Sequence, residues 1–282
     1  MSYLRAALMI FLIQSIFAAI GWYAYGQTGA IIGTAVALLF HFLVLWKADR
    51  MVLFMHKARE VDAEDPQPMV RAFVAECREL AAEAGLTRPR TYIIDTHQPN
   101  AFVVGRDSVH ASLAVTSGLL MTLNRAEARA VIAHELAHVR RGDSLAMGIA
   151  SAVSGLMSRI FWPVLAPLGL SKTWSRLVSR SVAILSNSKA REFAADREGA
   201  KICGKPLDLA SALEKIERNA GSLINPTAEK NPATAHLYVI DPLHASKKTR
   251  RSSHPTTEKR IARLRRIAET CDSTGDGAFG KR

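Results

Sequence analysis

The stretch AVIAHELAHVRRGD, residues 130–143, decides how this chain is interpreted, because it sets two histidines four positions apart in an apolar sequence. Residues four apart on an α-helix project from the same face, so His134 and His138 can direct two imidazole nitrogens at one metal ion. Glu135 lies on the neighbouring edge, where it can reach a water molecule beside that ion. The alternative, a surface helix with two exposed histidines, does not fit the apolar flanks, since burying unpaired His and Glu is costly.

A third metal ligand is expected downstream, because catalytic zinc takes three protein ligands and keeps one position open. The segment REFAAD, residues 191–196, places Glu192 and Asp196 four apart on a second predicted helix. Glu192 can bind the ion, and Asp196 can accept a hydrogen bond from a ligand imidazole. Two imidazoles and a carboxylate suit zinc, so we expect one Zn²⁺ per chain, with Glu135 taking a proton from water during attack.

The N-terminal region predicts a membrane anchor. No Asp, Glu, Lys or Arg occurs from Ala6 to Trp46, and one spanning helix needs about 20 apolar residues. We therefore predict a transmembrane helical hairpin, with helices at about residues 5–24 and 29–46 joined by the turn YGQTG. A cleaved signal peptide is the alternative, weakened by the second apolar stretch. Basic residues follow only the second helix, which predicts that both termini face the cytoplasm.

The net charge and the cysteines indicate which partners and which kinds of metal site to expect. The 282 residues carry a formal net charge of +12, which suits an anionic membrane surface or a nucleic acid. The chain has no aromatic interleaving among its basic residues and no recognised binding motif, so no nucleic-acid partner is expected. Cys77, Cys203 and Cys271 form no CxxC pair, which argues against disulfides and against a thiolate zinc site.

The remaining patterns predict a mainly α fold with a small β-sheet, an α+β class. Asn124 with Glu127 three residues later predicts a capping box at the start of the histidine helix, which should end near Gly142. Prolines make two segments, 221–235 and 242–255, look like loops. One further helix is predicted at 66–84, and three strands at 90–95, 100–104 and 110–116.

With these motifs in place, the sequence resembles the HtpX family of membrane metallopeptidases, relatives of the CAAX prenyl proteases. The resemblance covers nearly the whole chain. It rests on AVIAHELAHVRRGD (130–143), REFAAD (191–196), NAF (100–102), VTSGLL (115–120), NPATAHL (231–237) and HPTTEKRI (254–261).

The resemblance implies a gluzincin-like zinc metallopeptidase domain over residues 48–282, behind a transmembrane hairpin at 1–47. It implies that polypeptides bind along a cleft rim formed by Asn100, Ala101 and Phe102, where an exposed strand could pair with an extended substrate. The implied metal ligands are His134, His138 and Glu192, with Glu135 as general base.

Two more residues are implied to reach the site. The resemblance suggests that His254 and Arg260 stabilise the tetrahedral oxyanion through an N–H donor or a cation. For His254, a loop histidine before proline remains an open alternative.

The sequence departs from the resembled family in two segments. Relatives usually carry two further membrane helices where this chain has 144–187, an apolar stretch broken by arginines and prolines. A zinc ion shared by His138 and Glu192 requires zero or two membrane crossings between them, so this hairpin either spans twice or lies against the bilayer. The second departure is the basic run KKTRR at 247–251, which together with basic residues at 263–266 either meets lipid headgroups or forms a solvated face.

The function implied by the resemblance is an endopeptidase that cleaves damaged or misassembled membrane proteins, a protein quality-control and stress-response role. Its expected location is a bacterial-type cytoplasmic inner membrane, crossed several times, with the catalytic domain in the cytoplasm. Expected partners are polypeptide substrates and the lipid bilayer. A non-catalytic, zinc-stabilised membrane scaffold and a prenyl-protein-type protease are the alternatives, the latter disfavoured by the few predicted spans.

Overall fold

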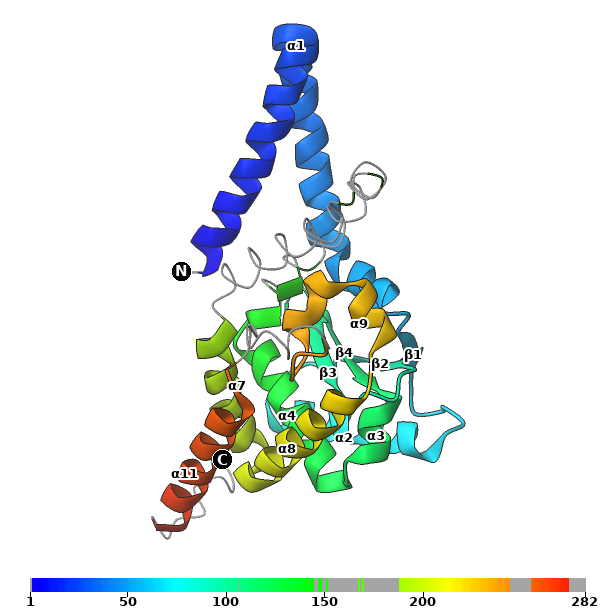
Figure 1. Ribbon diagram of the computed structural model, residues 1–282, viewed down its shortest axis with the longest axis vertical. Helices are drawn as coiled ribbons and strands as arrows, with labels where there is room; N and C mark the ends of the chain where they lie inside the picture. The colour runs from blue at the N-terminus through cyan, green and yellow to red at the C-terminus, as the bar shows by residue number, and fades with distance from the viewer. Residues whose placement is uncertain are drawn as a thin grey trace.

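The predicted strands form part of a small mixed sheet at the centre of the fold (Figure 1). The computed structural model describes residues 2–105, 107–144, 147–148, 151, 167, 169, 188–243 and 255–273. The strand order is β1-β2-β4-β3; β2 and β4 are parallel, and the other two pairs are antiparallel. The strands are β1 (Arg59–Val61), β2 (Arg90–Ile94), β3 (Ala101–Gly105) and β4 (Ala111–Thr116).

Alternate residues of the strands face two different cores, because successive side chains of a strand point to opposite faces. On one face, Val103, Leu113 and Val115 pack with apolar residues of α2 (Pro68–Glu83) and α4 (Arg125–Arg140). This first core holds the histidine helix against the sheet.

The second face of the sheet meets the end of the N-terminal helix. Phe102 and Val104 pack there with the last turns of α1 (Ser2–Met55) and with Tyr238, which follows the 3₁₀ helix η1 (Pro232–Leu237). The Phe102 and Tyr238 rings meet edge to face, with centroids 5.0 Å apart. The sheet therefore joins the apolar N-terminal region to the helices that carry the predicted site.

The histidine helix begins and ends as its sequence predicts. Asn124 accepts a hydrogen bond from the Glu127 backbone N–H at 2.9 Å, and Glu127 accepts one from the Asn124 backbone N–H at 3.0 Å. Gly142 then takes a φ of +70°, the left-handed conformation that glycine tolerates at a helix end. Both ends of α4 are confirmed.

Two short helices correct the prediction of a loop at 221–235. That segment contains a short helix, α9, and the 3₁₀ helix η1. Each has proline at its first turn, where the missing N–H is harmless, so the prolines mark helix starts rather than a loop. Of the second predicted loop, 242–255, most lies outside the described residues. The remaining helices are α3 (Ser117–Thr122), α7 (Ser188–Cys203), α8 (Pro206–Ser222), α9 (Pro226–Lys230) and α11 (Thr257–Ser273).

The strand β1 was missed by the sequence, which predicted three strands rather than four. It has only three residues, of which two are exposed, so no alternation could reveal it. The coarse fold class, mostly helical with a small sheet, is confirmed.

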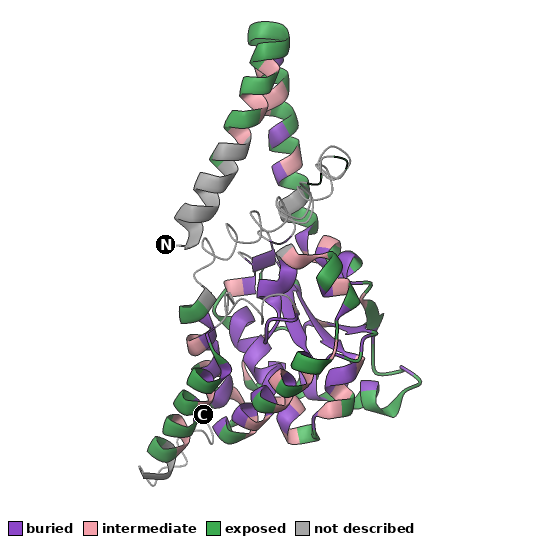
Figure 2. Cartoon of the chain, in the orientation of Figure 1, coloured by how far each residue is buried: buried purple, intermediate pink, exposed green. Residues whose placement is uncertain are grey.

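The N-terminal helix α1 is broken at Tyr25 and Gly26, within the predicted turn, and its two halves form a hairpin whose arms diverge away from the break (Figure 1). Its surface is largely exposed, although it is apolar (Figure 2). By length and composition, one candidate membrane span, Gln14–Leu43, is found among the described residues. Two separate crossings stay a prediction. The second predicted hairpin, 144–187, lies almost wholly outside the described residues.

Candidate metal centre

The two histidines of α4 lie together in the interior. His134 and His138 have exposed fractions of 0% and 3%. Their rings meet edge to face, with centroids 4.9 Å apart. The spacing of one helical turn has placed both imidazoles on the same face, as the sequence predicts.

The distant carboxylate of Glu192, on α7, completes a possible ligand set. Its two oxygens lie 3.5 Å from His134 Nε2 and 3.6 Å from His138 Nε2. One ligand atom from each of the three residues lies within 4.8 Å of the other two. Ligand atoms on a tetrahedral zinc ion, with bonds of about 2.1 Å, stand about 3.4 Å apart. The spacing of these donors therefore fits a single ion of that size.

Glu135 adds a buried carboxylate beside this ligand set. Its exposed fraction is 1%, and neither carboxylate oxygen has a hydrogen-bond partner in the part of the chain that the structure describes. Burial raises the pKa of Glu135 above its usual value. Buried carboxylates are normally hydrogen-bonded, so two oxygens without a protein partner indicate a position that a ligand or water occupies.

Asp196 lies between a ligand histidine and a buried arginine. Its Oδ1 is 3.1 Å from His134 Nδ1, on the side of the ring opposite Glu192. Arg260, on α11, donates to both oxygens of Asp196, at 2.9 Å from Nε and 2.7 Å from Nη2. Burial alone would raise the pKa of Asp196, but the Arg260 guanidinium holds it below the usual range.

Arg260 is anchored by more than this carboxylate. Its Nη1 donates to the Val239 carbonyl at 2.6 Å and lies 3.5 Å from a Glu192 oxygen. The guanidinium thus joins α7 to the chain segment after η1, and its exposed fraction is only 1%. The structure brings Arg260 to the site, while its predicted contact with an oxyanion stays a prediction.

The electric field of these groups favours a bound cation. Burial lowers the pKa of His134, but the Asp196 and Glu192 carboxylates outweigh it and raise that pKa to about 9. Glu135, Glu192 and Asp196 supply three buried carboxylates, against the two buried guanidinium groups of Arg260 and Arg191 among the described residues. A divalent cation would neutralise the excess negative charge, so both the charge and the donor spacing fit a zinc ion.

Two supporting residues were not predicted by the sequence. His138 Nδ1 lies 3.4 Å from the Asp143 carboxylate, which follows the end of α4. Gly199, one turn after Asp196, allows α7 to approach α4, because a Cβ there would lie 2.8 Å from the Cα of His134. An acidic residue at the end of the motif and a glycine inside a helix were the available signals.

The predicted substrate strand is less open than expected. Asn100, Ala101 and Phe102 are buried. The Asn100 side chain donates to the Ile240 carbonyl at 2.7 Å, and the Ala101 carbonyl accepts from the Val239 N–H at 3.0 Å. The strand β3 is at the edge of the sheet, but the segment after η1 covers this part of it. Substrate binding there stays a prediction, and His254 lies outside the described residues.

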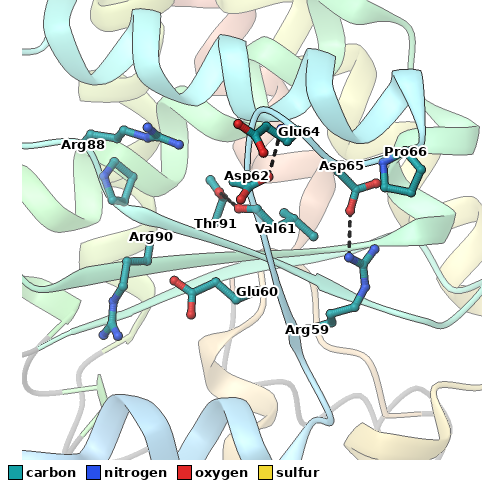
Figure 3. A pocket seen from close by; sticks show the side chains of 11 residues that line it. Arg59, Glu60, Val61, Asp62, Glu64, Asp65, Pro66, Arg88, Arg90 and Thr91 are labelled. Atoms are coloured by element: carbon teal, nitrogen blue, oxygen red, sulfur yellow. Dashed lines mark hydrogen bonds and ion pairs between the residues drawn. The ribbon is translucent and has the colours of Figure 1, made fainter.

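A surface pocket lies apart from this site. It is lined by β1, the residues that follow it and the start of β2, including Arg59, Glu60 and Arg90 (Figure 3). Arg59 there donates to Asp65 at 2.7 Å. None of the predicted site residues lines this pocket, so it is not part of the metal centre.

A helix carrying two buried histidines and a glutamate, completed by a carboxylate from a second helix, defines the class of metal-dependent hydrolases that use this motif. The family model of Peptidase family M48 matches residues 70–268. The chain belongs to peptidase family M48, which confirms the resemblance drawn from its motifs and implies a zinc-dependent peptidase.

Among solved structures, the chain is similar to the crystal structure of S. mikatae Ste24p. The two share 14% sequence identity, with a TM-score of 0.49. The match covers 93% of this chain and 65% of that chain, so this chain spans less than two thirds of the length of Ste24p.

Proposed function

We propose that the chain is a membrane-anchored zinc endopeptidase that cleaves damaged or misassembled membrane proteins. The observation that carries the proposal is the buried group of His134, His138 and Glu192, with its donor atoms within 4.8 Å of one another. Membership of family M48 supports the hydrolase class. The quality-control role rests on the sequence resemblance.

In this proposal His134, His138 and Glu192 hold one zinc ion. The bound ion would act as a Lewis acid and lower the pKa of a water molecule in its open position. Glu135 takes the proton of that water at a carboxylate oxygen and later delivers it to the leaving amine. The burial of this carboxylate and its lack of a hydrogen-bond partner among the described residues support that role.

Other residues act by holding the ligands in place. Asp196, with Oδ1 3.1 Å from His134 Nδ1, would accept a hydrogen bond from that nitrogen and so direct Nε2 at the ion. Arg260 holds Asp196 through two hydrogen bonds, and the oxyanion-stabilising role expected for it and for His254 belongs to the substrate-bound state. Binding of extended substrates beside β3, near Asn100, Ala101 and Phe102, would require the segment after η1 to leave this edge of the sheet.

The membrane part of the proposal concerns residues 1–47. The apolar exposed surface of α1 supports insertion of a helical hairpin into a bilayer (Figure 2). Residues 48–282 would form a gluzincin-like domain on the cytoplasmic side of a bacterial-type inner membrane. The segment 144–187 would be a second hairpin that spans or touches the bilayer.

The test is a cleavage assay on detergent-purified protein with casein as substrate. We expect Glu135→Gln to retain zinc at the wild-type ratio and to lose at least about a thousandfold in activity, because the base is removed while the ligands remain. Glu198→Gln, a similar change on α7 away from the ligands, is the matched control. Equal proteolysis by Glu135→Gln and wild type would overturn the role of Glu135.

Two alternatives predict different results. A zinc-stabilised scaffold would bind zinc and cleave nothing, and Glu135→Gln would still support the cellular role. A prenyl-protein-type protease would cleave prenylated peptides and spare casein. Each outcome is distinguished by adding a prenylated peptide to the same assay.

A further inference from the structure

A second pocket lies where the apolar part of α1 gives way to charged sequence. From Ala6 to Trp46 the chain has no charged residue, and Lys47 is the first charged residue after this stretch. Trp46 is 55% exposed, and its ring stacks on that of Phe42 at a centroid distance of 5.8 Å. Tryptophan followed by lysine is the arrangement expected at the boundary between hydrocarbon and lipid headgroups.

The pocket is formed by three separate segments. Its volume is about 450 Å³, and it is lined by the end of α1, the start of β2 and the turn between β3 and β4. Trp46, Lys47 and Arg50 come from α1, Arg90 from β2 and Val109 from the turn. Residues distant in sequence thus build one concave surface beside Trp46.

The lining of the pocket has an excess of positive charge. Arg90 donates to the Asp49 carboxylate at 2.6 Å, which satisfies that acidic residue. Figure 3 shows the Arg90 side chain extending away from Asp62 and Glu64 of the neighbouring pocket, with Glu60 closer to it. Lys47 and Arg50 are exposed, and neither forms an ion pair with another described residue. Two cations are therefore available to an anionic ligand.

The lining also includes two exposed apolar side chains. Val109, on the β3–β4 turn next to His110, is 58% exposed, and Trp46 of α1 is 55% exposed. A ligand that matches both the charged and the apolar side chains carries a phosphate next to an apolar body. Lysine and arginine are the usual protein partners of phosphate, and a phospholipid joins phosphate and acyl chains in one molecule.

We propose that the pocket of Trp46, Lys47, Arg50, Arg90 and Val109 binds the phosphate of an anionic phospholipid headgroup. The proposal rests on the proposed membrane anchoring of α1, but not on peptidase activity. Bound lipid would fix the height of the sheet above the bilayer, because β2 and the β3–β4 turn contribute to the same pocket.

The experiment measures lipid binding by the full chain in detergent. Phosphatidylglycerol is titrated against wild type and Lys47→Gln/Arg50→Gln, and native mass spectrometry reports the fraction of protein that retains lipid. Arg265→Gln/Arg266→Gln is the matched control, since it removes two exposed charges from α11, at the end of the molecule opposite α1 (Figure 1).

We expect the concentration for half-saturation to rise about tenfold or more in Lys47→Gln/Arg50→Gln and to stay unchanged in the control, since each cation near a headgroup contributes to anionic lipid binding. Phosphatidylcholine should bind all three proteins equally. Equal loss in both double variants, no loss in either, or displacement of the lipid by millimolar inorganic phosphate would overturn the lipid assignment.

The inactive Glu135→Gln protein should bind lipid normally, so a failed peptidase assay leaves this test intact. Protein that stays in solution without detergent would instead contradict the anchoring of α1.

Discussion

At the scale of single residues, Asp196 connects the metal ligands to the rest of the fold. One carboxylate faces His134 Nδ1 at 3.1 Å and receives two hydrogen bonds from Arg260. Glu192, one turn earlier on α7, faces the opposite nitrogen of the same imidazole. The ring is therefore held from both sides by residues four apart on a single helix.

Asp196→Asn should weaken metal binding and stability together. The amide keeps the size of the side chain, but it removes the charge that orients His134 and neutralises the buried Arg260. We expect zinc affinity to fall about 10- to 100-fold. The free energy of unfolding should fall by about 3–5 kcal/mol, as when one partner of a buried ion pair is removed. Competition with a chelator of known affinity and thermal unfolding in detergent measure the two effects.

The control for Asp196→Asn is Glu198→Gln on the same helix. Glu198 is partly exposed and pairs with Arg140 at 3.3 Å, so its loss should change stability by less than about 1 kcal/mol. Unchanged zinc affinity in Asp196→Asn would show that the imidazole is oriented without this carboxylate.

The sequence predicted those site residues that lie close to one another along the chain. The spacing of four between His134 and His138, and again between Glu192 and Asp196, follows from helix geometry and needs no knowledge of the fold. Val239 was not predicted, because it contributes a backbone carbonyl to Arg260 and any residue type could do so. The covering of β3 by the segment after η1 was missed for the same reason.

At the scale of elements, the contact between α4 and α7 sets the distance from the histidines to Glu192. Gly199→Ala tests this contact. The added Cβ would lie 2.8 Å from the Cα and 2.9 Å from the N of His134. These are backbone atoms, so the helices themselves must separate. We expect a loss of about 1–3 kcal/mol in stability, typical of overpacking, and a lower zinc content after purification.

The matched change on the exposed side of α7 is Lys201→Ala, which should leave zinc content and thermal midpoint close to wild type. Metal analysis and thermal unfolding of the two variants make the comparison. A Gly199→Ala protein with full zinc content and a wild-type midpoint would mean that α7 is positioned by other contacts.

The junction between α1 and the sheet contains a buried histidine that has no charged partner in the described part of the chain. His56 Nε2 lies 2.7 Å from Thr234 Oγ1, and its Nδ1 lies 2.9 Å from the Tyr238 hydroxyl. The Phe102 ring packs beside it. Burial lowers the pKa of His56 from 6.5 to about 4. The imidazole therefore stays neutral in the folded protein over most of the acidic range.

His56 should make the stability of the protein depend on pH. Above pH 6.5 the residue is neutral in both the folded and unfolded chains and has no effect. Between pH 6.5 and 4 the unfolded chain binds a proton that the folded chain does not, so stability falls by about 3 kcal/mol. The thermal midpoint of wild type should drop more steeply across this range than that of His56→Gln. Parallel pH profiles would contradict a neutral buried His56.

At the scale of the whole molecule, charge and apolar surface occupy different ends. The α1 helix lies at one end, and the basic α11 lies at the other (Figure 1). The net charge of +12 suggested a membrane surface, but a net charge does not say where each charged residue lies. Arg263 is an example of a basic residue with a structural role, because its guanidinium lies 3.7 Å from the centre of the Phe193 ring and holds α11 on α7.

Removal of the metal should destabilise the whole domain, because the carboxylates of Glu135, Glu192 and Asp196 would lose the cation that offsets their charge together with the buried guanidinium groups of Arg260 and Arg191. An ion present at 100 to 1,000 times its dissociation constant contributes about 3–4 kcal/mol to folding. For a chain of this size, that corresponds to a fall of about 5–15 °C in thermal midpoint on chelation. Added zinc should restore the midpoint. Glu192→Gln, which lacks a ligand, should begin at the lower midpoint and respond weakly to chelator, whereas Glu135→Gln should respond as wild type does. If a protein shown by metal analysis to have lost its ion unfolds at the wild-type temperature, the three carboxylates are balanced by other charges and the centre is not built around a cation.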